Sequence, residues 1–174
     1  MADRRLFVAL LAPDGLRQEA ERWQAAHADL PVRWLAGKNL HVTLVPPWYG
    51  QAEPAAAALR RVAAANFEIS FGRVAYGPDA RAPRLIWAEG KASPPLLDLV
   101  KRINVALGQG QEGRPFRLHL TLARFRPEEF AEFSGRALDG SIAWSAPAWT
   151  FALMESHLGP GGADYEALEE FPLS

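Results

Sequence analysis

The sequence predicts an α+β fold with two similar lobes, each an antiparallel sheet with helices on its outer side. Short apolar or alternating runs typical of strands are interleaved with segments of helical character. The order strand, helix, strand, strand occurs twice, from about Leu6 to Val74 and from Arg84 to Leu153. No low-complexity linker separates these blocks, so we expect one domain over residues 1–174, with intertwined lobes and a central cleft.

The first block begins with an apolar run and continues with short strands and helices. Strands are expected at residues 4–13, 32–37, 39–45 and 67–74, and helices at 14–30 and 53–65. Asp14 can cap the first helix, and Pro54 lies in the first turn of the second, where a missing N–H is tolerated. Pro46 and Pro47 should end the third strand, because proline donates no ladder hydrogen bond.

The second block repeats this order. Strands are expected at residues 83–90, 113–125 and 146–158, a final edge strand at 164–174, and helices at 93–108 and 127–133. Ser93 is a cap for the first of these helices and Gly108 ends it. The Gly/Pro segment at 159–162 is a turn rather than a phosphate loop, because it lacks the Gly-Lys-Ser/Thr ending.

Composition limits the expected cellular location of the protein and the kind of partner that it binds. The chain carries a net charge of -1 and no cysteine. A nearly neutral chain does not coat long nucleic acid with a broad basic face, and without thiols it has neither disulfides nor thiolate catalysis. No apolar run approaches the ~20 residues of a membrane span, and the N-terminal segment lacks a signal-peptide pattern. We expect a cytoplasmic enzyme, monomeric and without membrane contact.

Two copies of the frame His-x-Thr-Leu occur in distant predicted strands. They are "LHVTL" at residues 40–44 and "LHLTLAR" at residues 118–124. Residues i and i+2 of a strand share a face, about 7 Å apart. His41 and Thr43 therefore point the same way, and so do His119 and Thr121. If the two strands face each other, they present two imidazoles and two hydroxyls to one cleft.

This set of side chains fits phosphodiester hydrolysis without a metal or other cofactor. A neutral imidazole can take a proton from water while an imidazolium protonates the departing oxygen, since the ordinary histidine pKa of about 6.5 suits both roles. The hydroxyls can hold the non-bridging phosphate oxygens. Arg124 is the best-placed cation for the phosphate. Strict alternation turns it away from Thr121, so the strand must end or bulge near Ala123.

Other interpretations of these residues are weaker. A single His-x-Thr pair is usually structural, whereas two copies in predicted strands are far more specific. Two histidines without a cysteine or a third carboxylate make a poor zinc set, and no Gly-x-Ser-x-Gly elbow indicates a serine hydrolase. His27 is expected in the first helix as a surface or boundary residue, and His157 in packing or solvent. Trp48 and Tyr49 either stack a nucleobase or simply pack.

With these motifs the chain resembles the RNA 2′,3′-cyclic phosphodiesterases, also called 2′-5′ RNA ligases (LigT/ThpR-like), of the two-histidine (2H) phosphoesterase superfamily. The resemblance covers nearly the whole length, through "RRLFVAL", "VRWLAGKNLHVTL", "PRLIWAEG", "RPFRLHLTLAR" and "FALMESHLGPGGADYEALEEFPL". Its most specific part is the motif pair with the trailing Ala-Arg. It implies a bilobal fold with pseudo-twofold symmetry, with motif 1 at residues 41–44 facing motif 2 at 119–122.

The resemblance also implies an activity. This is metal-independent hydrolysis of RNA 2′,3′-cyclic phosphate ends, or of small cyclic nucleotides, to 2′-phosphomonoesters. His41 would be the proton donor to the leaving 3′ oxygen and His119 the proton acceptor on water. Thr43 and Thr121 would hold the phosphate. The reverse chemistry would join a cyclic end to a 5′-hydroxyl end through a 2′-5′ bond. From the residues alone, the two histidines are nearly interchangeable.

Two departures from the family pattern concern packing and substrate choice. Leu118 stands where the family usually has proline, which changes packing. "VPPWYG" stands where Phe-Leu-Gly is common, beside the substrate, so the preferred nucleotide can differ. Two alternatives remain open: a binding module that holds a nucleotide or RNA end without turnover, and a 2H phosphodiesterase for another cyclic or 2′-5′-linked nucleotide.

Overall fold

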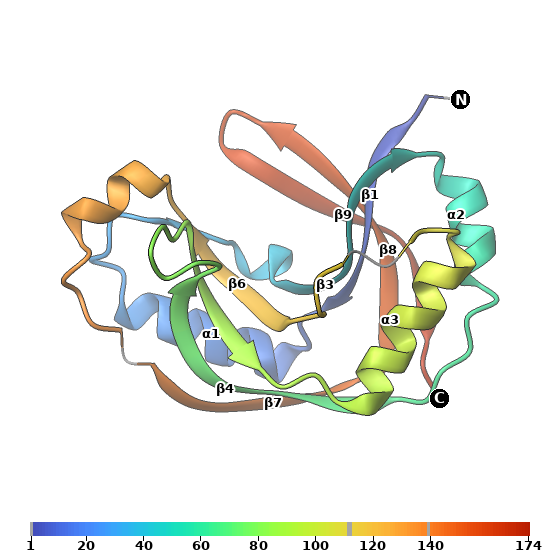
Figure 1. The fold of residues 1–174 in the computed structure, drawn as a ribbon, viewed down its shortest axis with the longest axis horizontal. Helices are drawn as coiled ribbons and strands as arrows, with labels where there is room; N and C mark the ends of the chain where they lie inside the picture. The colour runs from blue at the N-terminus through green and yellow to red at the C-terminus, as the bar shows by residue number, and fades with distance from the viewer. Residues whose placement is uncertain (1, 111–112, 139) are drawn as a thin grey trace.

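Two antiparallel sheets form the frame of the structure, a computed structural model that describes residues 2–110, 113–138 and 140–174 (Figure 1). The first sheet contains β1 (Arg4–Leu11), β3 (His41–Gly50), β8 (Thr150–Gly159) and β9 (Gly162–Pro172), in the order β3-β1-β8-β9. The second sheet contains β2 (Arg33–Trp34), β4 (Phe67–Gly77), β5 (Leu85–Gly90), β6 (Leu118–Arg124) and β7 (Ser141–Ala148), in the order β2-β6-β5-β4-β7. The predicted α+β class is confirmed.

The helices exchange partners between the two sheets. They are α1 (Asp14–Ala26), α2 (Ala52–Leu59) and α3 (Pro94–Ala106), with short 3-10 helices η1 (Gly37–Asn39) and η2 (Pro127–Glu132). Helix α1 leaves a strand of the first sheet but packs against β7 of the second, whereas α3 connects β5 and β6 of the second sheet but packs against β3 of the first (Figure 1). Within the described residues, no helix has the length and apolar character needed to cross a membrane.

The two sheets do not coincide with the two sequence blocks. The first sheet combines β1 and β3 from the start of the chain with β8 and β9 from its end, because β8 pairs with β1 along Leu6 to Ala9. What repeats is a smaller unit of a strand, a helix and an antiparallel partner strand. The units are β1-α1-β3, in which β2 and η1 precede β3, and β5-α3-β6. The second strand of each unit carries one motif.

Strand β3 continues through Pro46 and Pro47, so the prediction that they end it is wrong. The strand lies at the edge of its sheet and has only β1 as a neighbour, which is where a strand tolerates proline. Its register against β1 also shifts between the Leu6 and Val8 pairs, opposite the prolines. The missing N–H donors are thus accommodated by an irregular edge.

Two helix boundaries differ from expectation. Helix α2 ends at Leu59 rather than near residue 65. The chain beyond it is not helical, and its Ala64 carbonyl accepts a hydrogen bond from the Ser174 N–H at 3.1 Å. Asp14 lies inside the first turn of α1, whose N-cap position is Pro13, and it does not cap the helix.

Helix α3 begins and ends as its sequence predicts. The Ser93 hydroxyl accepts a hydrogen bond from the Leu96 N–H at 3.4 Å, the N-cap interaction expected of serine. Gly108 follows the helix with a φ of 65°, the left-handed conformation that favours glycine at a helix end. The next strand in the chain, β6, carries motif 2.

One main hydrophobic core joins both sheets and the three α-helices, and two smaller clusters lie outside it. The cluster on the first sheet contains Phe7, Ala9, Ala152 and Met154. The cluster on the second sheet contains Ala75, Leu85 and Trp87. Strand alternation places these small clusters on the sheet faces opposite the main core. The histidines of the two motifs lie against these two faces.

Candidate active site

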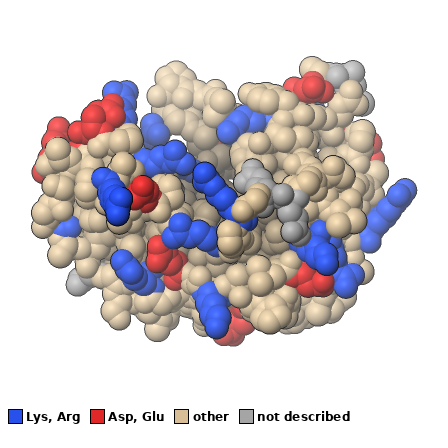
Figure 2. Space-filling model, in the orientation of Figure 1, with Lys and Arg blue, Asp and Glu red and all other residues tan. Residues whose placement is uncertain are grey.

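The two motif strands meet although they belong to different sheets. Strands β3 and β6 contact each other. In β3, His41 lies opposite Leu11 of β1, and Thr43 lies opposite Ala9. Directly opposed residues of an antiparallel pair share a face, so both motif side chains point to the face that carries Phe7. Figure 2 shows Lys and Arg side chains across the middle of this view, between the two halves of the molecule.

His41 is held on three sides. It is 9% exposed, and its Nδ1 lies 2.7 Å from the Asn39 carbonyl oxygen. Its Nε2 lies 3.1 Å from the Thr43 hydroxyl. The rings of Phe7 and Tyr165 lie at centroid distances of 5.2 and 4.9 Å. This imidazole is therefore fixed in orientation by its backbone partner and by aromatic packing.

His119 is held in the same manner from the second sheet. Its Nδ1 lies 3.0 Å from the Arg117 carbonyl oxygen, and the Trp87 ring packs against it at 4.6 Å. It lies opposite Glu89 of β5, while Thr121 lies opposite Trp87. Both motif side chains of β6 therefore share the face of the small Trp87 cluster.

The backbone carbonyls set the tautomer of both rings. A carbonyl oxygen can only accept, so Nδ1 carries the hydrogen in each neutral imidazole and Nε2 keeps its lone pair. In His41 that lone pair accepts from the Thr43 hydroxyl. The carbonyl comes in each case from the residue two positions earlier, Asn39 or Arg117. Each Nε2 is thus the nitrogen that can exchange a proton with a ligand, which in His41 would replace the Thr43 hydroxyl as its partner.

A bulge occurs at the leucine of each motif. Along β3 the partners of Ala9 and Val8 are Thr43 and Val45, so Leu44 has no opposite residue. Along β6 the partners of Trp87 and Ile86 are Thr121 and Ala123, so Leu122 is also the extra residue. Both leucines are buried in the main core. The two motifs therefore share a backbone irregularity as well as a sequence.

The second bulge decides where Arg124 points. After Leu122 the alternation resumes one step later, and Arg124 lies opposite Leu85, which shares its face with Trp87. Arg124 is consequently on the face of His119, as the sequence required of a phosphate-binding arginine. The residue that occupies the corresponding position after motif 1 is Pro46. Of these two positions, only the one after motif 2 therefore supplies a cation.

The pKa of His41 is lowered to about 4, chiefly by burial. The hydrogen bond to the Asn39 carbonyl opposes this shift, while the charges of Arg124 and His119 add to it. The pKa of His119 is lowered as well, again chiefly by burial. Since both rings respond to Arg124, and His41 responds to His119, the three groups share one electrostatic environment.

Sequence analysis missed a cluster beside His119. The Arg117 guanidinium carbon lies 4.7 Å from the centroid of the Trp87 ring, and one of its nitrogens lies 3.6 Å from Glu89. The Trp87 indole N–H donates to Glu89 at 2.8 Å. The charge of Arg117 lowers the pKa of His119, whereas the Arg117 carbonyl and the charge of Glu89 raise it. Arg117 precedes His119 by two positions and Glu89 lies opposite it, so alternation would have found both once the strand pairing was known.

Trp48 is not brought to the histidines. It lies opposite Leu6 and packs against the main core, on the other face of β3 from His41. Tyr49, opposite Arg5, is on the histidine face and is 68% exposed. It lies about 20 Å from the motif along the strand, judged by a rise of about 3.3 Å per residue. The proposed stacking by Trp48 gains no support from this placement.

The other two histidines lie elsewhere. His27 is the C-cap residue of α1, a boundary position as expected, but it is buried rather than at the surface. It stacks on Trp23 at 3.7 Å and hydrogen-bonds the Trp23 carbonyl. His157 is half-exposed on the β8–β9 hairpin, 3.0 Å from Glu166. Together with Glu155 these two offer ligand atoms within 4.8 Å of one another, but Glu155 is already paired with an arginine.

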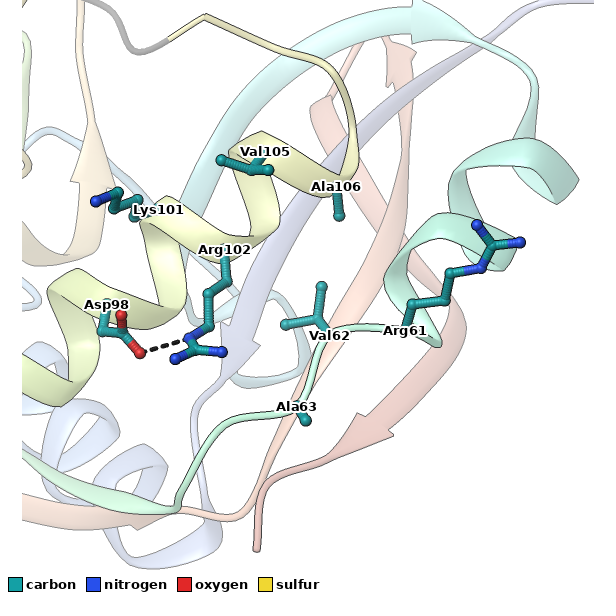
Figure 3. Close-up of a pocket in the computed structure, with 8 residues that line it drawn as sticks. All are labelled: Arg61, Val62, Ala63, Asp98, Lys101, Arg102, Val105 and Ala106. Carbon is teal, nitrogen blue, oxygen red and sulfur yellow. Dashed lines mark hydrogen bonds and ion pairs between the residues drawn. The ribbon is translucent and has the colours of Figure 1, made fainter.

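A pocket of about 390 Å³ lies between α3 and the segment that follows α2 (Figure 3). It is lined by Arg61, Val62, Ala63, Asp98, Lys101, Arg102, Val105 and Ala106. None of these residues belongs to either motif or to the strands that carry them. The candidate site is therefore the motif pair, where titratable groups, hydroxyls and a cation converge, rather than this pocket.

A two-sheet α+β fold with a His-x-Thr motif on each of two facing strands defines the two-histidine phosphoesterases. The chain belongs to the 2′-5′ RNA ligase superfamily, whose family model matches residues 12–160. The family resemblance and the fold expected from it are thereby confirmed.

Individual relatives agree with this assignment. An RNA 2′,3′-cyclic phosphodiesterase of Geobacillus stearothermophilus is 28% identical over 186 residues, which cover 96% of this chain and 56% of that protein. The chain thus spans little more than half the length of that relative. The crystal structure of E. coli LigT complexed with 3′-AMP has a TM-score of 0.78 at 26% identity, with 99% of both chains covered. A Thermus thermophilus protein has a TM-score of 0.77 at 25% identity, with 97% of both covered.

Proposed function

We propose that this protein hydrolyses RNA 2′,3′-cyclic phosphate ends to 2′-phosphomonoesters, with the two motif histidines as acid and base. The observation that carries the proposal is the pair of imidazoles on facing strands, each with Nδ1 held by a carbonyl and Nε2 left to act. The activity named for the G. stearothermophilus relative and the ligand in the LigT complex support the same substrate class.

The proposed reaction breaks one P–O bond and consumes one water. The neutral Nε2 of His119 takes a proton from water as its oxygen attacks phosphorus. The bond from phosphorus to the 3′ oxygen breaks, and His41, as imidazolium, gives its Nε2 proton to that oxygen. The product carries the phosphate on the 2′ oxygen, and the two histidines then exchange their protons with solvent.

The choice of His41 as donor follows the family resemblance. Burial lowers its pKa to about 4, so it must gain a proton when substrate binds. The negative charge of a phosphodiester beside the ring raises the pKa of a histidine, which supplies the required shift. His119, on β6, then starts the reaction neutral and acts as the base.

Arg124 and the two threonines complete the proposed phosphate site. Arg124 lies on the face of His119 and influences both imidazoles, so its guanidinium can compensate charge that builds on the non-bridging oxygens. The hydroxyls of Thr43 and Thr121 can donate to the same oxygens and hold the phosphorus in line between the rings.

The test is an assay of cyclic-ended RNA with EDTA present, with identification of the monoester formed. We expect the 2′-monoester, and we expect His41→Ala and His119→Ala each to lower turnover by about 10²- to 10⁴-fold. His157→Ala is the matched control, since that histidine is half-exposed on the hairpin and should leave turnover unchanged. Near-full activity in either motif variant would sink the paired mechanism.

The same assay separates the alternative functions. Tight binding of cyclic-ended RNA without product favours a binding module. Inactivity on cyclic ends with turnover of a 2′-5′-linked or other cyclic nucleotide favours a different 2H substrate. Adding RNA with a 5′-hydroxyl end tests the ligase reaction, in which that hydroxyl replaces water as the attacking group and forms a 2′-5′ bond.

A further inference from the structure

Two arginines face each other across neighbouring strands beside the site. Arg33 of β2 is paired in register with Arg124 of β6, so both side chains are on one face of the second sheet. No ion pair joins either guanidinium to a carboxylate within the described part of the chain. Like charges directly opposite each other destabilise a sheet, so a bound anion is the natural complement of this pair.

Arg33 lies further from the motif histidines than Arg124 does. Strand β2 is the edge of the second sheet and has β6 as its neighbour. Neighbouring strands are about 4.8 Å apart. The backbone of Arg33 is therefore displaced from that of Arg124 by about this distance, toward the edge of the sheet. Arg124 is therefore the arginine placed to bind the phosphate that would react between the histidines. Arg33 is placed to bind a second anionic group next to that phosphate.

The Arg33 guanidinium extends to the turn of the β8–β9 hairpin, which belongs to the first sheet. A Cβ atom added to Gly162 would lie 3.3 Å from both the Cζ and the Nε of Arg33. Gly162 has a φ of 106°, a conformation that favours glycine. The planar group thus lies against Gly162, which has no side chain, and so connects the edge strand of the second sheet with the β8–β9 hairpin of the first.

We propose that Arg33 binds the phosphate on the 5′ oxygen of the terminal nucleoside, while Arg124 faces the cyclic phosphate. This inference rests on the proposed function and narrows its substrate to RNA ends that carry a second phosphate. RNA presents phosphates at successive positions, and guanidinium forks bind them in bidentate fashion. A directly opposed arginine pair matches two neighbouring phosphates better than it matches one.

The test compares three substrates: a nucleoside 2′,3′-cyclic phosphate, the same compound with a 5′-phosphate, and a dinucleotide ending in the cyclic phosphate. For the wild type, kcat/KM should be about tenfold higher for the two substrates with a second phosphate, the size expected of one charge-assisted contact. Arg33→Gln should bring that ratio close to one, and Arg33→Lys should keep part of it. A dinucleotide with an uncharged methylphosphonate linkage should behave like the single-phosphate compound.

Controls separate the outcomes. Arg102→Gln removes an arginine of α3 from the pocket shown in Figure 3 and should leave the substrate ratio as in the wild type. An unchanged ratio in Arg33→Gln, or an advantage for the dinucleotide that persists with the methylphosphonate linkage, overturns the inference. If the wild type hydrolyses none of the substrates, the proposed function fails. Thermal unfolding of each variant shows that the differences do not come from misfolding.

Discussion

The imidazoles of His41 and His119 are each backed by a carbonyl two residues earlier in the chain. This contact is local to each strand, so it does not depend on the pairing of the two sheets. It fixes Nδ1 as the protonated nitrogen and leaves Nε2 to the ligand. The two halves of the site thus share one geometry, while their burial and neighbouring charges differ.

The lowered pKa of His41 predicts a pH-dependent stability. Between about pH 6.5 and pH 4 the unfolded chain binds a proton at this histidine and the folded chain does not. The free energy of unfolding should therefore fall as pH falls through this window, by about 3 kcal/mol from His41. Urea titrations at several pH values measure it.

The control for this prediction is His41→Gln, which removes the titrating group. The variant should lose less stability than the wild type between pH 7 and pH 4, with the remaining loss due to other groups such as His119, whose pKa is also lowered. Equal losses in the two proteins would show that His41 does not carry the effect.

Alternation alone places some of the site residues but not all. It placed His41 with Thr43 and His119 with Thr121, because the side-chain period of a strand is two. Arg124 required a bulge, which sequence analysis could demand but not locate. Its position at Leu122 became known only from the pairing with β5.

The strands that carry the motifs are irregular next to the motif residues. Each has a bulge at the motif leucine, and β3 has a second register shift near the prolines. Residue propensities do not reveal these irregularities. For that reason Trp48 was expected beside the substrate, whereas the observed register places its side chain against the main core. The presence of a strand is thus easier to predict than its ends or the face on which its side chains lie. One extra residue moves every later side chain to the opposite face.

Strand β4 supports His119 through a glycine. A Cβ atom at Gly77 would lie 2.5 Å from the Trp87 indole, which packs against His119. Gly77→Ala should therefore displace the indole, destabilise the protein by about 1–3 kcal/mol, and lower kcat/KM. The measurements are urea unfolding, steady-state kinetics and the NMR titration of the His119 ring.

A second glycine of the same strand provides the comparison. A Cβ atom at Gly72 would meet nothing within 4 Å, so Gly72→Ala should leave both the kinetics and the His119 titration unchanged. If Gly77→Ala behaves like Gly72→Ala in these measurements, the indole does not position His119.

The whole molecule should unfold in one step. The main core includes residues of both sheets and of the three α-helices, and each repeated unit places its helix on the other sheet. Neither half can therefore keep its core when the other unfolds. Far-UV circular dichroism and the fluorescence of the six tryptophans should give coincident urea transitions. Two separated transitions would contradict this account.

At this scale the sequence indicated two sheets, but it could not show which strands belong to each. The first sheet uses strands from both ends of the chain. The pairing of β1 with β8 joins residues far apart in sequence, and such pairings leave no local pattern. The repeated order of strands and helices and the family resemblance both predicted two lobes, but neither placed β1 and β8 in one sheet.

The path of the chain also limits how the halves can move. Four connections pass from one sheet to the other: β1 to β2, β2 to β3, β3 to β4 and β7 to β8. A hinge motion requires that few segments connect the two moving bodies. Here four segments do so, and a bend between the sheets would disrupt the packing of a helix. The two motif strands are therefore held at a fixed spacing. For the proposed function, this predicts that RNA ends are selected by their fit between the motifs, without a clamp that closes around them.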